Sequence, residues 1–344
     1  MNKKNPFRKN VKRDLKEIFY FYLDNEKHGK LAKAGWIKRW LFSDWWFFKS
    51  VILKLSPFRR FFFFAGWILF FAGFGTYSGN TVFLKLSFFF LFFIILLELK
   101  DKLLAQDELA VGKEVQSALM PDENPVFKGW DIWLFNKAAK EVGGDLIDYI
   151  KIKNNKLGIA LGDVAGKGLG AALLMARLQA SLTALVPNFE SFAELGKQLN
   201  MLLCKDYLQN KFASLVYIEL ESGSGDLRIL NAGHLPPVKL KEGKLEEMLK
   251  GQSALGLSTT SVYEEQHTSL ARGEILLVFS DGLTEARNED GDFFGENRLN
   301  DLILEIKGNS ASETGNHIIT EIEKFTGYAR QSDDISLIVL KRAD

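Results

Sequence analysis

Two apolar stretches between residues 61 and 97 limit what this chain can fold into more than any other feature. Residues 61–75 carry no charge, residues 82–97 carry only Lys85 and Glu98 follows them directly, and thirteen Phe lie between positions 61 and 93. Two core helices of a soluble domain are the alternative, but such helices seldom meet apolar neighbours on every face. We therefore expect a two-span transmembrane hairpin over 61–98. Each span is short and needs flanking residues to reach the ~20 that cross a bilayer.

Charges at the ends of these stretches predict the orientation of the hairpin. Arg59 and Arg60 precede the first stretch, and Lys100 and Lys102 follow the second. By the positive-inside rule, both ends of the hairpin then face the cytoplasm and residues 76–81 lie outside. The protein is expected to be multi-pass, with everything after residue 98 on the cytoplasmic side.

The first sixty residues are strongly basic and rich in aromatic side chains. They contain sixteen Lys or Arg and five Asp or Glu, a net charge of about +11, together with Trp36, Trp40, Trp45 and Trp46. Rings at headgroup depth and cations on lipid phosphates are typical of a segment in the membrane interface. Nucleic acid would suit the charge equally well, but no nucleic-acid-binding motif accompanies it. We expect residues 1–60 to be a juxtamembrane segment that contacts lipid and binds no nucleic acid.

A linker helix is expected over residues 99–125, where the pattern becomes charged with apolar residues partly at helical intervals. Pro121 and Pro125 end it and mark a domain boundary. This helix allows a homodimer, although its heptads are too irregular to assert a coiled coil. From residue 126 to 344, predicted strands cluster early and late around paired helices, which favours an α+β domain. The single cysteine, Cys204, excludes a disulfide framework and a Cys-rich zinc site.

Aspartates stand at the ends of four predicted strands in this domain. Two glycines precede Asp145, which opens strand 145–152, and Asp163 follows strand 157–161. Asp281 follows strand 275–280, and the pair Asp333 and Asp334 opens strand 335–340. A turn or a helix cap explains any single one of these. If the four meet, oxygen ligands without His or Cys select Mg²⁺, Mn²⁺ or Ca²⁺. Two such ions ~3.5–4 Å apart lower the pKa of water and clamp phosphoryl oxygens.

Three other motifs are weaker. The loop around Lys167 is not a P-loop, because Leu161 and Gly168 stand where that motif needs Gly and Ser or Thr. The Gly-Gly-Asp at 143–145 is shared with diguanylate cyclases, but the next residues lack that motif's acidic-aromatic pair. His234 is a general acid or base, or more often a structural histidine at a strand end. Lys167 has no role assigned, and Asp148 is expected only to shape the site.

The ordered set of motifs resembles the SpoIIE-like branch of the type 2C metal-dependent (PPM) serine/threonine phosphatases. It covers about residues 111–340 and consists of GGDLIDY, LGDVAGKGLGAALLMA, NAGHLPP, FSDGLTEARNEDGDFFGENRL and DDISLIVL. The resemblance implies a central β-sandwich flanked by helix pairs, preceded here by two transmembrane helices and the linker helix. It also implies two Mn²⁺ or Mg²⁺ ions. By the same resemblance the catalytic metal ligands are Asp145, Asp163, Asp281, Asp333 and the Val164 carbonyl, with Asp334 less favoured than Asp333.

By that resemblance, the expected function is hydrolysis of phosphoserine or phosphothreonine in a regulatory protein. The family implies a substrate such as an anti-sigma-factor antagonist in a partner-switching pathway. The protein would be anchored in the bacterial cytoplasmic (inner) membrane, with its catalytic domain in the cytoplasm. Two alternatives stay open: a catalytically idle phosphatase-like scaffold and, less favoured, a nucleotidyl cyclase.

Overall fold

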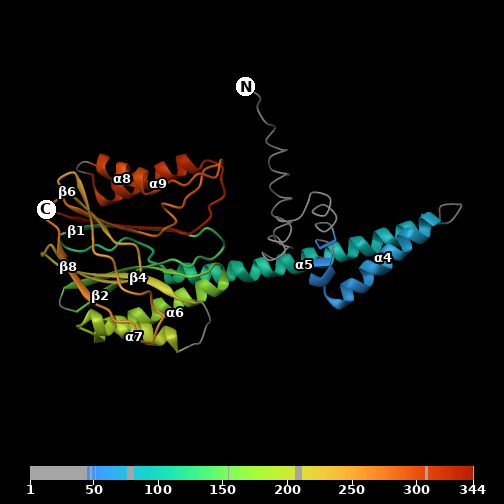
Figure 1. Ribbon diagram of the computed structural model, residues 1–344, viewed down its shortest axis with the longest axis horizontal. Helices are drawn as coiled ribbons and strands as arrows, with labels where there is room; N and C mark the ends of the chain where they lie inside the picture. Colours follow the sequence, from blue (N-terminus) through green and yellow to red (C-terminus); the bar gives the residue numbers. More distant parts are fainter. Residues whose placement is uncertain are drawn as a thin grey trace, which may run out of the picture. The chain divides into compact units, whose positions relative to one another are not determined.

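The computed structural model in Figure 1 describes residues 45–46, 49–50, 52–75, 81–153, 155–205, 211–306 and 309–343. The chain divides into two compact units, residues 1–105 and 106–344, and each is described by itself. Most of the predicted juxtamembrane segment 1–60 lies outside the described residues. The same holds for the predicted external loop, except Thr81.

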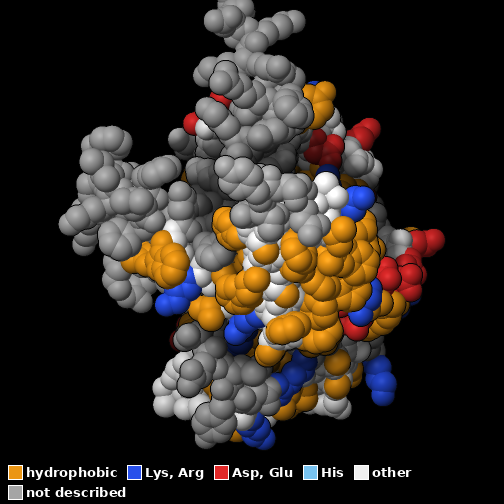
Figure 2. Space-filling model, turned by 90° about the vertical axis from the view of Figure 1, so that its right-hand side faces the viewer, with side chains coloured by type: hydrophobic (Ala, Val, Ile, Leu, Met, Phe, Trp, Pro, Cys, Tyr) orange, Lys and Arg blue, Asp and Glu red, His pale blue; other side chains and the backbone are white. Residues whose placement is uncertain are grey.

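Helices α4 (Pro57–Gly75) and α5 (Thr81–Leu119) pack antiparallel in the first unit. Arg59 near the start of α4 pairs with Glu98 at 2.7 Å and with Asp101. The ring of Phe62 meets the edges of Phe90 and Phe93, with centroids 5.3 and 5.9 Å apart. Aromatic and aliphatic side chains of both helices are exposed and gather into a broad apolar patch (Figure 2). A helical hairpin with apolar outer faces is thus present where one was predicted.

Two helices among the described residues are long and apolar enough to cross a membrane. One is α5, whose most apolar window is 11% buried. The other is the stretch Leu169–Asn188 in the second unit, whose most apolar window is 44% buried. α4 is not one of them. The two-span membrane hairpin therefore remains a prediction, although the packing of α4 on α5 is compatible with it.

The second predicted span and the predicted linker form one helix. α5 runs without a break from Thr81 through residue 98 to Leu119. The change from apolar to charged residues does not interrupt it, because Lys, Glu, Gln and Leu all favour helix. It ends two residues before Pro121, so residues 120–125 of the expected linker are not helical.

Two five-stranded antiparallel sheets form the second unit. One has the order β1 (Trp130–Lys137), β10 (Ile335–Arg342), β9 (Ile275–Phe279), β6 (Val238–Lys241), β7 (Lys244–Glu247). The other has the order β2 (Leu146–Ile152), β3 (Lys156–Val164), β4 (Ala213–Glu221), β5 (Asp226–Ala232), β8 (Glu265–Ser269). A cluster of buried side chains from both sheets, including Ile159, Leu276 and Ile338, fills the space between them. The predicted β-sandwich is confirmed.

A pair of helices covers the outer face of each sheet (Figure 1). Helices α6 (Leu169–Leu185) and α7 (Phe192–Cys204) pack on the β2–β8 sheet, and α8 (Glu296–Glu305) and α9 (Ala311–Thr326) on the other. Strand β3 shows why its sequence is continuously apolar. Leu157, Ile159 and Leu161 face the sandwich core, whereas Ala160 faces the helices, so both sides are buried. The α+β class and the flanking helix pairs are as predicted.

Strands β7 and β8 were not predicted. Their sequences, KLEE and EQHTS, are mostly polar and lack the alternation that marks a half-buried strand. Both lie at the edge of their sheets, where one side of the strand stays in solvent. The other predicted strands and helices agree with the structure within a few residues at each end.

Candidate metal centre

The sheet registers place the four predicted aspartates at one end of the sandwich. Asp145 directly precedes β2, and because Leu146 pairs with Gly162, it lies beside Asp163 near the end of β3. In the other sheet Leu337 pairs with Phe279, so Asp281, which follows β9, and Asp333, which precedes β10, share an end. Each sheet therefore contributes two carboxylates.

Asp145 is the most buried of the four, with 3% of its surface exposed. The Ser336 hydroxyl donates a hydrogen bond to its Oδ2 at 2.6 Å, and the Asn136 amide donates to Ser336 Oγ at 2.9 Å. Burial, and next the charge of Asp163, raise the pKa of Asp145 well above its ordinary value. The hydrogen bond from Ser336 thus orients this carboxyl group, and a bound cation would favour its ionised form.

The remaining carboxylates act on one another electrostatically. Burial, followed by the charges of Asp281 and Asp333, raises the pKa of Asp163 to about 6. Burial and then the charge of Asp333 also raise the pKa of Asp281. Like charges shift each other's pKa only at short range, so the four aspartates form one electrostatic group.

The adjacent residues Asp333 and Asp334 have different surroundings. Asp334 is buried, and its oxygens accept hydrogen bonds from the backbone N–H of Ala139 at 2.7 Å and of Gly144 at 2.6 Å. It therefore holds the loop that leads into Asp145. Asp333 is partly exposed, and its Oδ2 faces Lys167 at 2.6 Å. These contacts favour Asp333 over Asp334 as the ligand, as the family resemblance does.

Two glycines allow the backbone to close around this end of the sandwich. A Cβ on Gly282 would lie 1.8 Å from the Asp334 carbonyl oxygen, so no larger residue fits there without a backbone shift. A Cβ on Gly144 would lie 3.2 Å from the Val164 carbonyl oxygen. The Val164 carbonyl oxygen therefore lies close to the loop before Asp145.

The donor set fits a hard divalent cation. It consists of carboxylates and a backbone carbonyl without His or Cys, which suits Mg²⁺ or Mn²⁺. Among the described residues, no group of three or more His, Cys, Asp or Glu side chains is close enough in its present positions to hold one metal ion. The ligand roles of Asp145, Asp163, Val164, Asp281 and Asp333 thus remain predictions, supported by shared location and mutual charge effects.

Two other residues singled out from the sequence lie outside this group. His234 is buried, its ring Nδ1 lies 3.1 Å from the Leu235 carbonyl oxygen, and burial lowers its pKa to about 4. Together with the hydrogen bonds between its backbone and Asn231, this indicates a structural histidine. Asp148 accepts from the Gln179 amide at 3.0 Å, and the same amide donates to the Leu119 carbonyl. Asp148 therefore helps hold α6 and the end of α5.

Three contacts at the site were not foreseen. Ser336 and Lys167 both lie within the sequence motifs, but the motifs do not indicate that Ser336 binds Asp145 or that Lys167 binds Asp333. Gln116 near the end of α5 exchanges two hydrogen bonds with the backbone of Gly143, at 2.7 and 3.0 Å. Nothing in the helical pattern indicates that this glutamine binds the loop before Asp145.

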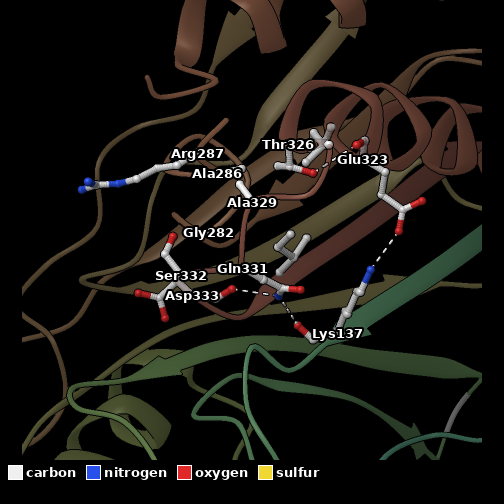
Figure 3. Close-up of a pocket in the computed structure, with 13 residues that line it drawn as sticks. Lys137, Gly282, Ala286, Arg287, Glu323, Thr326, Ala329, Gln331, Ser332 and Asp333 are labelled. Atoms are coloured by element: carbon white, nitrogen blue, oxygen red, sulfur yellow. Dashed lines mark hydrogen bonds and ion pairs between the residues drawn. The ribbon is translucent and has the colours of Figure 1, made fainter. Parts of the chain in front are cut away.

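A cavity of about 250 Å³ adjoins Asp333 (Figure 3). Asp333 and Gly282 line one side of it, and the ion pair of Lys137 with Glu323, 2.8 Å apart, lines another. The Gln331 amide donates hydrogen bonds to the carbonyl oxygens of Lys137 at 2.9 Å and Asp333 at 2.8 Å. These bonds hold the loop before β10 in place beside the cavity. A ligand bound at Asp333 would therefore lie next to this cavity.

Comparisons with known proteins identify the family to which the second unit is similar. Residues 153–343 match the family described as "Stage II sporulation protein E (SpoIIE)". The chain is similar to "Phosphoserine phosphatase RsbU" of Bacillus subtilis (strain 168), with 28% identity over 239 residues that cover 69% of this chain and 70% of RsbU.

Two solved structures share the fold. The "SiaA-PP2C domain of Pseudomonas aeruginosa" has a TM-score of 0.60 at 20% identity and covers 71% of this chain and 99% of that one. The RsbU and RsbW domains of Rv1364c from Mycobacterium tuberculosis have a TM-score of 0.54 at 24% identity. That match covers 64% of this chain and 61% of the Mycobacterium tuberculosis chain, which is under two thirds of that chain's length.

Proposed function

Because this chain belongs to the SpoIIE family of PP2C-type phosphoprotein phosphatases, we propose that it hydrolyses phosphoserine or phosphothreonine in a regulatory protein at a site that binds two Mn²⁺ or Mg²⁺ ions. The observation that carries the proposal is the grouping of Asp145, Asp163, Asp281 and Asp333 at one end of the sandwich. Their mutual effect on pKa supports a role in binding cations.

Each residue of the site has a distinct task in this scheme. Asp145 and Asp163 would be ligands shared by both ions, and Asp281 and Asp333 would complete the coordination of the second ion. The Val164 carbonyl is a further candidate ligand. When bound, the ions supply charge neutralisation at the phosphoryl oxygens and a lowered pKa for water. The neighbouring side chains keep the ligands in place: Ser336 orients Asp145, and Asp334 fixes the loop before it. Mutation of such supporting residues typically weakens metal binding 10–100-fold.

The substrate and the location are further parts of the proposal. RsbU is named a phosphoserine phosphatase, and a phosphorylated regulatory protein such as an anti-sigma-factor antagonist is the corresponding substrate here. The apolar helices α4 and α5 support membrane anchoring in a bacterial cytoplasmic membrane, with the phosphatase domain in the cytoplasm. Contact with lipid and a homodimer through α5 belong to the same proposal.

The test uses the full chain in detergent with a phosphoserine peptide and Mn²⁺. Asp145→Asn and Asp281→Asn keep the side-chain shape and remove the charge, so each is expected to lower kcat/KM by several orders of magnitude. Asp226→Asn is the matched control, because Asp226 opens β5 at the opposite end of the same sheet as Asp163 and is exposed. Activity that survives both site substitutions would refute the assigned site.

The two alternatives predict different results with the same preparation. An idle scaffold binds no Mn²⁺ in calorimetry and releases no phosphate. A nucleotidyl cyclase turns over GTP and leaves the phosphoserine peptide intact. Release of inorganic phosphate that depends on Mn²⁺ separates the phosphatase from both.

A further inference from the structure

Lys167 contacts the aspartate group from the loop between β3 and α6. Its ammonium donates hydrogen bonds to Asp333 Oδ2 at 2.6 Å and to the Ser332 carbonyl at 2.8 Å. Among the described residues, Lys167 is the only basic side chain that forms an ion pair with one of the four grouped aspartates. A positive charge beside candidate metal ligands therefore needs a physical account.

A purely structural role accounts poorly for this lysine. About half of its side chain is exposed, and exposed ion pairs contribute little to stability. The loop takes its shape from Gly166 and Gly168, which have φ of 114° and 77°, values that L side chains avoid. Replacing Lys167 therefore leaves the determinants of the loop conformation in place.

The contact falls on the oxygen that a metal ligand would use. Asp333 Oδ1 accepts the backbone N–H of Asp334 at 3.1 Å, whereas Oδ2 accepts, among the described contacts, only from Lys167. Lys167 occupies that same Oδ2. A divalent ion bound there must displace the ammonium, whose flexible four-carbon stem can carry it a few ångströms away.

We propose that Lys167 is the phosphate-binding residue of this site: its ammonium leaves Asp333 when that carboxylate ligates a metal, and then binds the phosphoryl oxygens of the phosphoprotein. A lysine ammonium is a compact point charge, and charge-assisted hydrogen bonds to phosphate are among the strongest that side chains make. This inference rests on the proposed phosphatase function and adds the group that recognises the phosphate.

The experiment compares Lys167→Met with Lys140→Met in the full chain in detergent. Lys140 lines the same small hollow as Lys167 and Asp333, is exposed, and makes no ion pair among the described contacts, so it matches the charge change. Titration calorimetry measures the affinity for Mn²⁺ alone and then the affinity of the Mn²⁺-loaded protein for inorganic phosphate. We expect Lys167→Met to weaken phosphate binding about 10–100-fold and to leave Mn²⁺ binding unchanged or tighter. Lys140→Met should change neither.

Several results would overturn the inference. Unchanged phosphate affinity in Lys167→Met, or an equal loss in Lys140→Met, removes the specific role of Lys167. A parallel loss of Mn²⁺ affinity shows that the lysine supports the ligands instead of the phosphate. Lys167→Arg, which keeps the charge, should recover part of the phosphate affinity, and no recovery counts against the role. A wild-type chain that binds no Mn²⁺ and hydrolyses no phosphoserine peptide refutes the proposed function first, and this inference with it.

Discussion

Asp163→Asn is expected to make the metal-free protein more stable while it inactivates the enzyme. Burial and the nearby charges of Asp281 and Asp333 together raise the pKa of Asp163 from 3.8 to about 6, so its negative charge is unfavourable in the folded protein. Unfolding removes this unfavourable free energy of the Asp163 charge, because the aspartates of an unfolded chain are surrounded by water. Asparagine has nearly the same shape without the charge, so it removes the penalty from the folded state.

The pKa shift sets the size of the effect. Each unit of pKa corresponds to about 1.4 kcal/mol, so a shift of about two units gives at most ~3 kcal/mol of folding free energy. Asp163 is partly exposed, and solvent and salt screen its interactions. We therefore expect a gain of about 1–2 kcal/mol at pH 7, or roughly 2–8 °C in Tm for a domain of this size.

The pH dependence gives the sign of the effect. A carboxyl group whose pKa is raised by folding contributes no penalty below the unfolded value of 3.8, and the penalty grows as the pH rises toward 6. Thermal unfolding of wild type and variant in EDTA, from pH 4 to pH 8, should show curves that coincide at pH 4 and separate by pH 6. With saturating Mn²⁺ the order should reverse, because the wild type alone gains the full binding energy. A variant that is destabilised equally at every pH in EDTA would refute the reasoning.

Two further predictions concern residues that support the site. Gly282→Ala places a methyl group 1.8 Å from the Asp334 carbonyl, so we expect a loss of about 2–3 kcal/mol in chemical denaturation; Gly170→Ala, with no atom within 4 Å of its new Cβ, should be neutral or stabilising by up to ~1 kcal/mol. Similar losses in both variants would contradict the close approach as the cause. Ser336→Ala removes the hydrogen bond to Asp145, and calorimetry should show Mn²⁺ affinity reduced about 10–100-fold. Unchanged affinity would mean that Ser336 does not position the ligand.

The strand-end aspartates were predictable because each adjoins an apolar run and lies near glycine or serine. Strand pairing then places them at one end, which follows from a sandwich of antiparallel strands. The apolar pattern alone does not distinguish the roles of Asp333 and Asp334, although the family resemblance favours Asp333 as the ligand. The difference depends on backbone N–H groups of Ala139 and Gly144, some 190 residues away in sequence.

Long-range polar contacts explain what was missed around the site. Ser336 is one polar residue in the apolar part of β10. The pairing of β10 with β1 brings Asn136 to its hydroxyl, whereas Asp145 directly precedes β2 in the other sheet. The bonds between Gln116 and Gly143 join a helix to a loop 27 residues later. Helical periodicity identifies which faces are apolar, and it carries no information about such a partner.

At the level of the fold, apolar periodicity was sufficient for the α+β class and for most strands and helices, whereas the sandwich with its helix pairs was implied by the family resemblance. It was insufficient for β7 and β8, which are edge strands and mostly polar. It also suggested a boundary near residue 98, where composition changes but backbone conformation does not. Composition reports the environment of a helix, whereas continuity depends on whether any residue disfavours helical backbone.

The two neighbouring aspartates before β10 also give a way to recognise inactive relatives of this protein from sequence. The Asp334 carboxylate binds the backbone of the loop that leads into Asp145, whereas the Asp333 carboxylate pairs with Lys167. A descendant that loses only the first carboxylate should therefore keep a well-formed domain and still present its surface to a phosphoprotein, as a binding module without turnover. Loss of the second should cost the fold of the loop as well. Selection can thus turn such a phosphatase into an adaptor through one position of this pair, and not through the other.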